Sequence, residues 1–204
     1  MSAFVGNELA LELLDPGSVS FQRLFRHKDA EWVEPEPKYR TQRCDPPRAH
    51  ATDYALLYMA DSVAAAAVEC RILNADRNDR YTYDEALTKA YWVARYSFTN
   101  PAVFIPIDAD NRATLGLNGF KIGYAHYQQA AHELWTRYRN VAHGLSWSSF
   151  HRNQPGRVYA LWHEHKTAIG LKRPVPPFQK LFEDLQWTRF LKENPDIGAI
   201  AVAP

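Results

Sequence analysis

The sequence predicts an α+β fold, with residues 1–204 forming one domain that has a mixed sheet core and flanking helices. Its 204 residues are 46% hydrophobic and 13% aromatic, which is ample for a single domain with a substantial core. Strand-like and helix-like segments follow one another without the regular strand–helix–strand order of a doubly wound sheet. No internal repeat or low-complexity tract divides the chain. We therefore expect a single unit.

The first half of the chain is expected to place a long loop between two strands. A strand is predicted over residues 19–26 and a second over 54–59. Between them, residues 31–48 are dominated by proline and charge, and long loops inside compact domains are often functional. A helix follows the second strand, and either Asp61 or Ser62 can cap it, because each has a side-chain oxygen that accepts an orphaned N–H.

This helix contains four consecutive alanines and ends on Glu69. Small side chains on every face allow close approach to neighbouring backbone and leave Glu69 as the main functional group of the helix. Two interpretations are open at this stage. Glu69 is either a solvated residue beside Arg71 or a group that the fold directs to a site.

The second half of the chain mixes further strands and helices. The patterns predict a helix over 83–96, a strand over 102–107, a helix over 124–139, strands over 144–149 and 157–163 joined by the turn NQPG, and an amphipathic helix within 178–194. Aromatic residues recur at helical spacing in the helix over 124–139. Such a stripe is more typical of core or interface than of a cofactor site.

Composition excludes several classes of protein. With 24 Lys+Arg against 23 Asp+Glu, the formal charge is +1, so no global field favours nucleic acid or an anionic membrane. The apolar runs fall short of the roughly 20 residues that span a bilayer. The N-terminus lacks the basic region of a secretory signal, and Cys44 and Cys70 are too few for a disulfide framework. We therefore expect a cytoplasmic protein without direct membrane or nucleic-acid partners.

A metal site is not expected from local spacing. If residues 157–163 continue as a strand, His163 and His165 would lie on one face of it, which is the geometry of a weak transition-metal site. No third ligand occurs at motif spacing.

The segments LFRHKD, YRTQRCDPPR, ALLYMADSVAAAAVE, and HGLSWSSFHR with PGRVYALW occur in this order. Together they resemble the RES domain family, which is named for its arginine, glutamate and serine. The resemblance covers about residues 21–162, and residues 163–204 are interpreted as a C-terminal helical extension. Its most specific part is Leu57–Glu69. The pair Phe25-Arg26 resembles the aromatic–arginine element of the family.

Two further motifs carry the resemblance. Arg43–Pro47 is similar to the family's arginine–aromatic–Asn/Asp–Pro–Pro element, although Cys44 stands where an aromatic residue is usual and Arg48 where glycine is common. Gly144–Ser149 resembles the family's Gly-(Ile/Leu)-x-aromatic-x-Ser strand and places the family serine at Ser149.

The resemblance implies a fold similar to ADP-ribosyltransferases and a chemistry in which NAD+ is the substrate. It implies the toxin of a bacterial toxin–antitoxin pair, held inactive by a cognate antitoxin or immunity protein. The reaction would be NAD+ glycohydrolysis or phosphorolysis at the nicotinamide–ribose bond. ADP-ribosylation of a protein target and an inactive protein-binding module are the alternatives. Neither the acceptor, nor a homo-oligomer, nor delivery into other cells is decided by the sequence.

Residue types match this chemistry. Breaking the nicotinamide–ribose bond develops a cation on the sugar, which the carboxylate of Glu69 would stabilise. Arg26 and Arg43 offer planar forks for the diphosphate of NAD+. Tyr58 offers an aromatic face and a hydroxyl near the ring or ribose, and Ser149 a hydroxyl for the ribose or carboxamide. Glu69, Arg43 and Ser149 are the catalytic candidates, and the expected chemistry needs no metal.

Each residue also has a structural interpretation. Tyr58 could be a core residue of its strand, Arg26 and Arg43 could form surface ion pairs, and Ser149 could only end a strand. Alternation along the strand places Arg23 on the face opposite to Arg26, so only one of these two arginines should reach a site.

Overall fold

The structure is a computed structural model that describes residues 9–75, 81–118, 123–149 and 156–200. Its larger sheet contains β1 (Glu12–Leu14), β2 (Phe21–Phe25), β3 (Leu56–Ala60), β6 (Trp92–Tyr96), β7 (Ala102–Pro106), β8 (Gly144–Ser148), β9 (Arg157–Trp162) and β10 (Gln179–Lys180). The smaller sheet contains β4 (Leu73–Ala75), β5 (Tyr81–Asp84) and β11 (Gly198–Ile200). The described helices are α1 (Val63–Glu69), α2 (Glu85–Ala90), α3 (Ala109–Thr114), α4 (Tyr124–Tyr138) and α5 (Leu185–Glu193).

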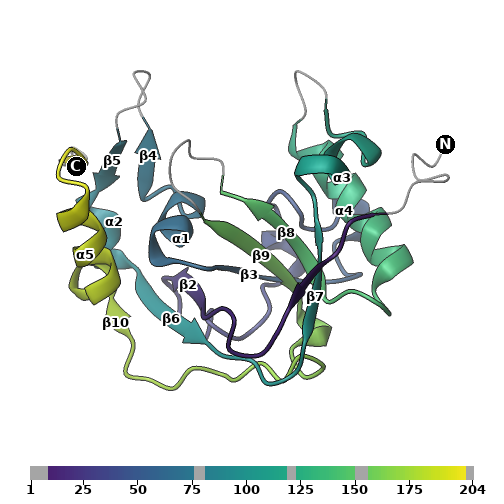
Figure 1. Ribbon diagram of the computed structural model, residues 1–204, viewed down its shortest axis with the longest axis horizontal. Coiled ribbons are helices and arrows are strands. Elements are labelled where there is room, and N and C mark those ends of the chain that lie inside the picture. The colour runs from purple at the N-terminus through teal and green to yellow at the C-terminus, as the bar shows by residue number, and fades with distance from the viewer. Residues whose placement is uncertain (1–8, 76–80, 119–122, 150–155, 201–204) are drawn as a thin grey trace.

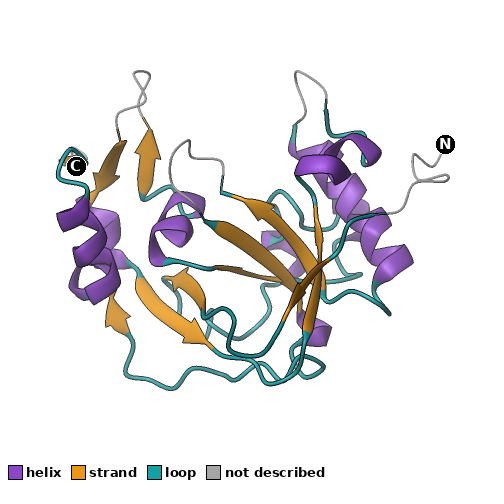
Figure 2. Cartoon of the chain, viewed as in Figure 1, coloured by secondary structure: helices purple, strands orange, loops and turns teal. Residues whose placement is uncertain are grey.

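The larger sheet is mixed, with the order β1-β7-β8-β9-β3-β2-β6-β10. Strands β7 and β8 pair in parallel, whereas β8, β9, β3, β2 and β6 pair antiparallel in succession. In the view of Figure 1 and Figure 2, α2 and α5 lie at the left of this sheet, α1 lies near its middle, and α3 and α4 lie at the right. A mixed sheet with flanking helices confirms the predicted α+β class.

One face of the sheet carries both α1 and α4. Ala60 pairs with Val158, and Val158 pairs with Trp147, so alternation places these residues and Tyr58 on the same face. Helix α4 packs there against a core cluster that includes Trp147 and Val158, and α1 packs beside Ala60 in a neighbouring cluster. In Figure 1 the two helices stand apart, with α1 near the middle and α4 at the right. Tyr58 and Trp147 thus belong to the strip of sheet between them.

The opposite face is filled by aromatic side chains. The Tyr159 ring lies 5.1 Å from that of Phe21 and 5.0 Å from that of Phe104, centroid to centroid. Phe21 on β2 and Phe104 on β7 are also only 6.2 Å apart, although β3, β9 and β8 separate their strands in the sheet. The sheet is therefore strongly curved, with this aromatic face on its inner side.

Most predicted elements are confirmed. The strands before and after the long loop are β2 and β3, the alanine helix is α1, and the later elements are β7, α4, β8 and β9. Ser62 rather than Asp61 caps α1, because its hydroxyl accepts the Ala65 N–H at 3.2 Å. Of the predicted NQPG turn, residues 153–155 lie outside the described residues.

The prediction of one helix over 83–96 is wrong. Asp84 ends β5 and caps α2 by accepting the Leu87 N–H at 3.0 Å. The chain then leaves the helix, and β6 pairs with β2 from Trp92 to Tyr96. Pairing along the sheet outweighs a weak local helical pattern.

The C-terminal prediction is only partly correct. Within 178–194, β10 and a 3₁₀ turn (Leu181–Glu183) come before α5. Helix α5 starts after Asp184, whose carboxylate accepts the Gln186 and Trp187 N–H groups and pairs with Arg95. No helix in the described part of the chain is long and apolar enough to cross a membrane.

Candidate functional site

Glu69 stands at the last position of α1, just before a sharp stop of the helix. The Arg71 N–H donates to the Val68 carbonyl and the Ile72 N–H to the Ala67 carbonyl, which is a Schellman motif. Arg71 has a φ of 56° in the left-handed region, which costs a non-glycine residue roughly 1–2 kcal/mol. A carboxylate at the negative end of a helix is also unfavourable. Helix stability therefore does not explain Glu69.

Glu69 interacts with Arg43 and Trp147. The Glu69 side chain is exposed, yet the surrounding protein is dense enough for desolvation to raise its pKa. The positive charge of Arg43 opposes that rise, and the Trp147 indole N–H lowers the pKa further. The indole nitrogen lies against the carboxylate without reaching full hydrogen-bond geometry. Such a carboxylate is open to a ligand, and its charge is stabilised chiefly by one arginine.

Arg43 reaches this position from the long loop and rests on α4. Its guanidinium carbon lies 5.2 Å from the ring centroid of Tyr127 and 5.8 Å from that of Tyr124, within cation–π range. The Gln128 side-chain amide donates to the Gln42 carbonyl at 3.0 Å, which ties the loop to the same helix. The aromatic stripe of α4 is thus core on one side and a support for Arg43 on the other.

The loop geometry around Arg43 is set by Tyr58 and Asp45. The Tyr58 hydroxyl donates to Asp45 Oδ1 at 3.1 Å and accepts the Cys44 N–H at 3.3 Å. Asp45 Oδ2 accepts the Gln42 N–H at 2.7 Å. Burial raises the pKa of Asp45, and these hydrogen bonds partly oppose the rise. The Tyr58 hydroxyl therefore holds the loop, and its ring edge faces Trp147 with the centroids 6.2 Å apart.

Cys44 is accommodated in the core. Its side chain is fully buried, burial strongly raises the pKa of its thiol, and its carbonyl accepts the Tyr54 hydroxyl at 2.9 Å. The departure from the aromatic residue usual in the family thus leaves a well-packed loop rather than a reactive thiol.

Ser149 follows β8 directly and lies near the start of α1. Its N–H donates to the Gly156 carbonyl at 2.8 Å, and alternation places its side chain on the same face as Trp147. Its hydroxyl is buried without a hydrogen-bond partner among the described residues. A Cβ on Gly156 would lie 2.8 Å from the Ala65 Cβ. The alanine helix therefore approaches the backbone as closely as the sequence suggested.

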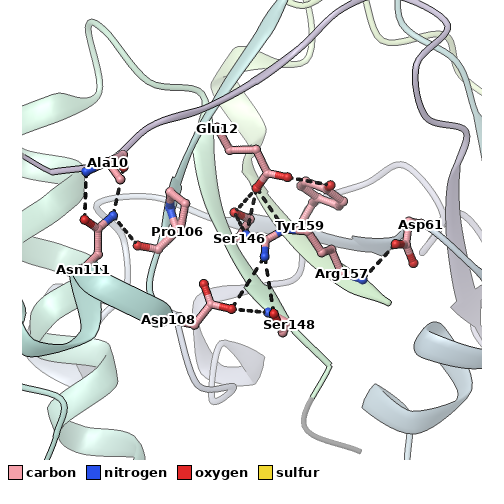
Figure 3. Close-up of polar contacts among 10 residues, drawn as sticks. All are labelled: Ala10, Glu12, Asp61, Pro106, Asp108, Asn111, Ser146, Ser148, Arg157 and Tyr159. Carbon is pink, nitrogen blue, oxygen red and sulfur yellow. Dashed lines mark hydrogen bonds and ion pairs between the residues drawn. The ribbon is translucent and has the colours of Figure 1, made fainter. Parts of the chain in front are cut away.

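A polar network on the opposite face fixes β8 and β9 (Figure 3). Glu12 from β1 accepts hydrogen bonds from Ser146 at 2.5 Å, from Tyr159 at 3.0 Å and from Arg157 Nε at 3.0 Å. The Arg157 N–H donates to Asp61 at 2.9 Å. These contacts hold β8 and β9 together, and Trp147 in β8 and Ser149 just after it project to the other side of the sheet.

Arg26 is placed beside the site rather than within the Glu69–Arg43 pair. Its guanidinium carbon lies 5.1 Å from the Tyr91 ring centroid. Burial raises the pKa of Cys70, the residue after Glu69, and both Arg23 and Arg26 oppose this rise, with Arg23 having the stronger effect of the two. Arg23 instead donates to the Ala30 carbonyl at 3.1 Å and to the Tyr58 carbonyl at 2.8 Å. Arg23 thus has a structural role, and Arg26 remains exposed.

Sequence reasoning missed Asp45, Trp147 and Tyr127 as parts of the site. Asp45 and Trp147 stand inside the two motifs that pointed to Arg43 and Ser149, so their positions in those motifs were the available signal. Tyr127 was visible only as part of an aromatic stripe, which has no signature for cation binding.

The segment His163–His165 differs from the prediction. It forms a 3₁₀ turn, so its two imidazoles do not share a strand face. His163 is buried, and desolvation lowers its pKa to about 3. It lines a cavity of about 760 Å³ together with Trp32, Arg40, Trp135, Arg139 and Lys166. None of the residues predicted for the site lines this cavity.

Comparison with known proteins identifies the family. The model of the RES domain matches residues 22–183, so the chain belongs to the RES domain family. No curated protein sequence matches it. A solved structure, the crystal structure of the M. tuberculosis MbcT–MbcA toxin–antitoxin complex, matches with a TM-score of 0.56 at 19% identity, covering 80% of this chain and 85% of the matched chain. The chain therefore shares its fold with the matched chain of that complex.

Replacing Tyr58 by phenylalanine tests how the loop is held. Tyr58→Phe leaves buried Asp45 and the Cys44 N–H without their shared partner. We expect the free energy of unfolding in urea to fall by about 1–3 kcal/mol. Tyr39→Phe, at a tyrosine that is 64% exposed, is the control. Equal stability of the two variants would show that the Tyr58 hydroxyl does not stabilise the loop.

Proposed function

We propose that this protein consumes NAD+ by cleaving the nicotinamide–ribose bond, and that it acts as the toxin of a toxin–antitoxin pair. Membership of the RES domain family and the fold shared with a chain of a toxin–antitoxin complex support this proposal. The single observation that carries it is the accessible carboxylate of Glu69, whose negative charge is favoured by Arg43.

The chemistry needs a negative charge beside the sugar as the bond breaks. Nicotinamide leaves with the bonding electrons, and the ribose carbon develops positive charge that Glu69 stabilises. Arg43 has two roles. Its charge favours the ionised form of Glu69 before the substrate arrives, and its guanidinium offers a planar fork to the diphosphate. Ser149 is the candidate hydroxyl for the ribose or the carboxamide, and its oxygen is buried without a hydrogen-bond partner among the described residues. Arg26, whose side chain is exposed, is a second candidate for the diphosphate.

The acceptor distinguishes the alternatives. Water gives ADP-ribose, phosphate gives its phosphorylated counterpart, and a protein side chain makes the enzyme an ADP-ribosyltransferase. A RES domain that only binds a partner would release nothing. The test is incubation of the purified chain with NAD+, with and without phosphate, while free nicotinamide and the ribose product are followed. Release of nicotinamide supports the proposal, and its absence under both conditions contradicts it.

Replacing Glu69 by glutamine should separate binding from chemistry. Glu69→Gln keeps the size of the side chain but removes the charge that matters most as the bond breaks. We expect turnover to fall by about a hundredfold or more, while NAD+ binding largely survives. Because the pKa of Glu69 is raised, the parent's turnover should increase as the pH rises through that value.

Two variants serve as comparisons for this prediction. Glu193→Gln changes the last residue of α5, a matched helix end far from the Arg43 loop in sequence, and should leave turnover unchanged. Arg43→Ala removes a ground-state contact to the diphosphate, so it should raise KM at least as much as it lowers kcat. A folded Glu69→Gln protein with close to the parent's turnover would contradict the catalytic role and show that Glu69 is only a solvated helix residue.

Catalysis should need no metal. Nicotinamide departs as a neutral group and requires no Lewis acid. We expect the rate of nicotinamide release to be the same before and after treatment with EDTA. Loss of activity in EDTA that zinc or magnesium restores would count against this mechanism.

A neutralising partner should act between the Arg43 loop and Ser149, where the Glu69 side chain is exposed. An enzyme that drains NAD+ must be held inactive in its own cell, and covering this region is the most direct means. We expect NAD+ binding, measured by calorimetry, to be lost in the inhibited complex. A complex that still binds NAD+ normally but is inactive would rule out this mode of inhibition.

A further inference from the structure

Three side chains with metal-binding atoms converge where the segment after the long loop meets α4. His50 Nδ1 lies 3.1 Å from Asp53 Oδ2, and His132 Nε2 lies 2.9 Å from the same oxygen. The two imidazole rings are stacked with their centroids 4.2 Å apart. The three ligand atoms all lie within 4.8 Å of one another. None of these residues belongs to the Glu69–Arg43 pair.

We propose that His50, Asp53 and His132 bind a divalent transition-metal ion, with Zn²⁺ as the best-matched ion, and that the ion joins the 50–53 segment to α4. Two imidazole nitrogens and one carboxylate oxygen are a donor set that suits zinc. Zinc–ligand bonds of about 2.0–2.2 Å require ligand atoms about 3.3 Å apart in a tetrahedron. The two nitrogen–oxygen distances are already near this value, and the two imidazole nitrogens, which lie within 4.8 Å of each other, would have to come to about 3.3 Å.

The site can be reached from solvent and is charged appropriately. The side chains of His50, Asp53 and His132 are 49%, 31% and 14% exposed. One carboxylate and two imidazoles form a donor set that suits a divalent cation. Asp53 also lines the 760 Å³ cavity, which gives an ion a path of entry. Water would complete the coordination.

The ion would stabilise the contact that supports the Arg43 loop. Tyr54 follows Asp53, stacks at 5.3 Å on Trp135 of α4, and donates its hydroxyl to the Cys44 carbonyl. A metal ion that joins Asp53 to His132 would therefore stabilise the same contact between this segment and α4. This role is structural: the ion would contact neither the substrate nor the reacting atoms, so its removal should lower the melting temperature and leave the rate of nicotinamide release unchanged.

Calorimetric titration of the EDTA-treated, dialysed full chain with Zn²⁺ tests the proposal. We expect one Zn²⁺ per chain, and binding that weakens by more than about tenfold in His50→Ala and in His132→Ala. Asp53→Asn, which keeps the shape but loses the anionic ligand, should also bind more weakly. His126→Ala removes an exposed imidazole from the first turn of α4 and should bind as the parent does. Zn²⁺ should raise the melting temperature of the parent but not of Asp53→Asn.

The outcomes are distinct from those of the NAD+ assays. No stoichiometric binding by the parent, or equal binding by the parent, His50→Ala and Asp53→Asn, would overturn the proposal, since the chain has 8 histidines that could bind Zn²⁺ elsewhere. If His132→Ala does not fold, His50→Ala decides the question because its ring is half exposed. A stability loss in Asp53→Asn that is the same with EDTA as with Zn²⁺ would show that the cluster is only hydrogen-bonded.

Discussion

The site depends on the electrostatic interaction of one carboxylate with one guanidinium across the strip of sheet between α1 and α4. Glu69 comes from the end of α1, and Arg43 comes from a loop that rests on the aromatic rings of α4. Dense surroundings raise the pKa of Glu69, and the charge of Arg43 favours its ionised form. Displacing α1 or the Arg43 loop would change the electrostatic environment of the Glu69 carboxylate. The fold and the proposed chemistry are therefore coupled at this pair.

The surrounding structure holds this pair at some cost to local stability. The helix ends on a carboxylate, the next turn forces Arg71 into the left-handed region, and Asp45 is buried with a raised pKa. Unfavourable features of this kind cluster where function constrains the chain. Tyr58 on one face and the Glu12 network on the other oppose them by fixing the loop and the two central strands.

The sequence predicted those features that depend on residues close together in the chain. The alanine helix, a cap at either Asp61 or Ser62, and a close approach of the helix to neighbouring backbone follow from side-chain size and capping, and the family motifs pointed to Glu69, Arg43 and Ser149. The strand β6 was missed because pairing with β2 outweighs its helical pattern. The His132–Asp53 contact joins residues 79 positions apart, which no motif spacing reveals.

The most direct test of the central claim is a crystal structure of the Glu69→Gln protein with NAD+, since slow turnover should keep the substrate intact. The account predicts that the ribose carbon bearing nicotinamide lies against residue 69, with the diphosphate on the Arg43 guanidinium. NAD+ bound instead in the cavity lined by Trp32, Trp135 and Lys166, or with its ribose remote from residue 69, would contradict it.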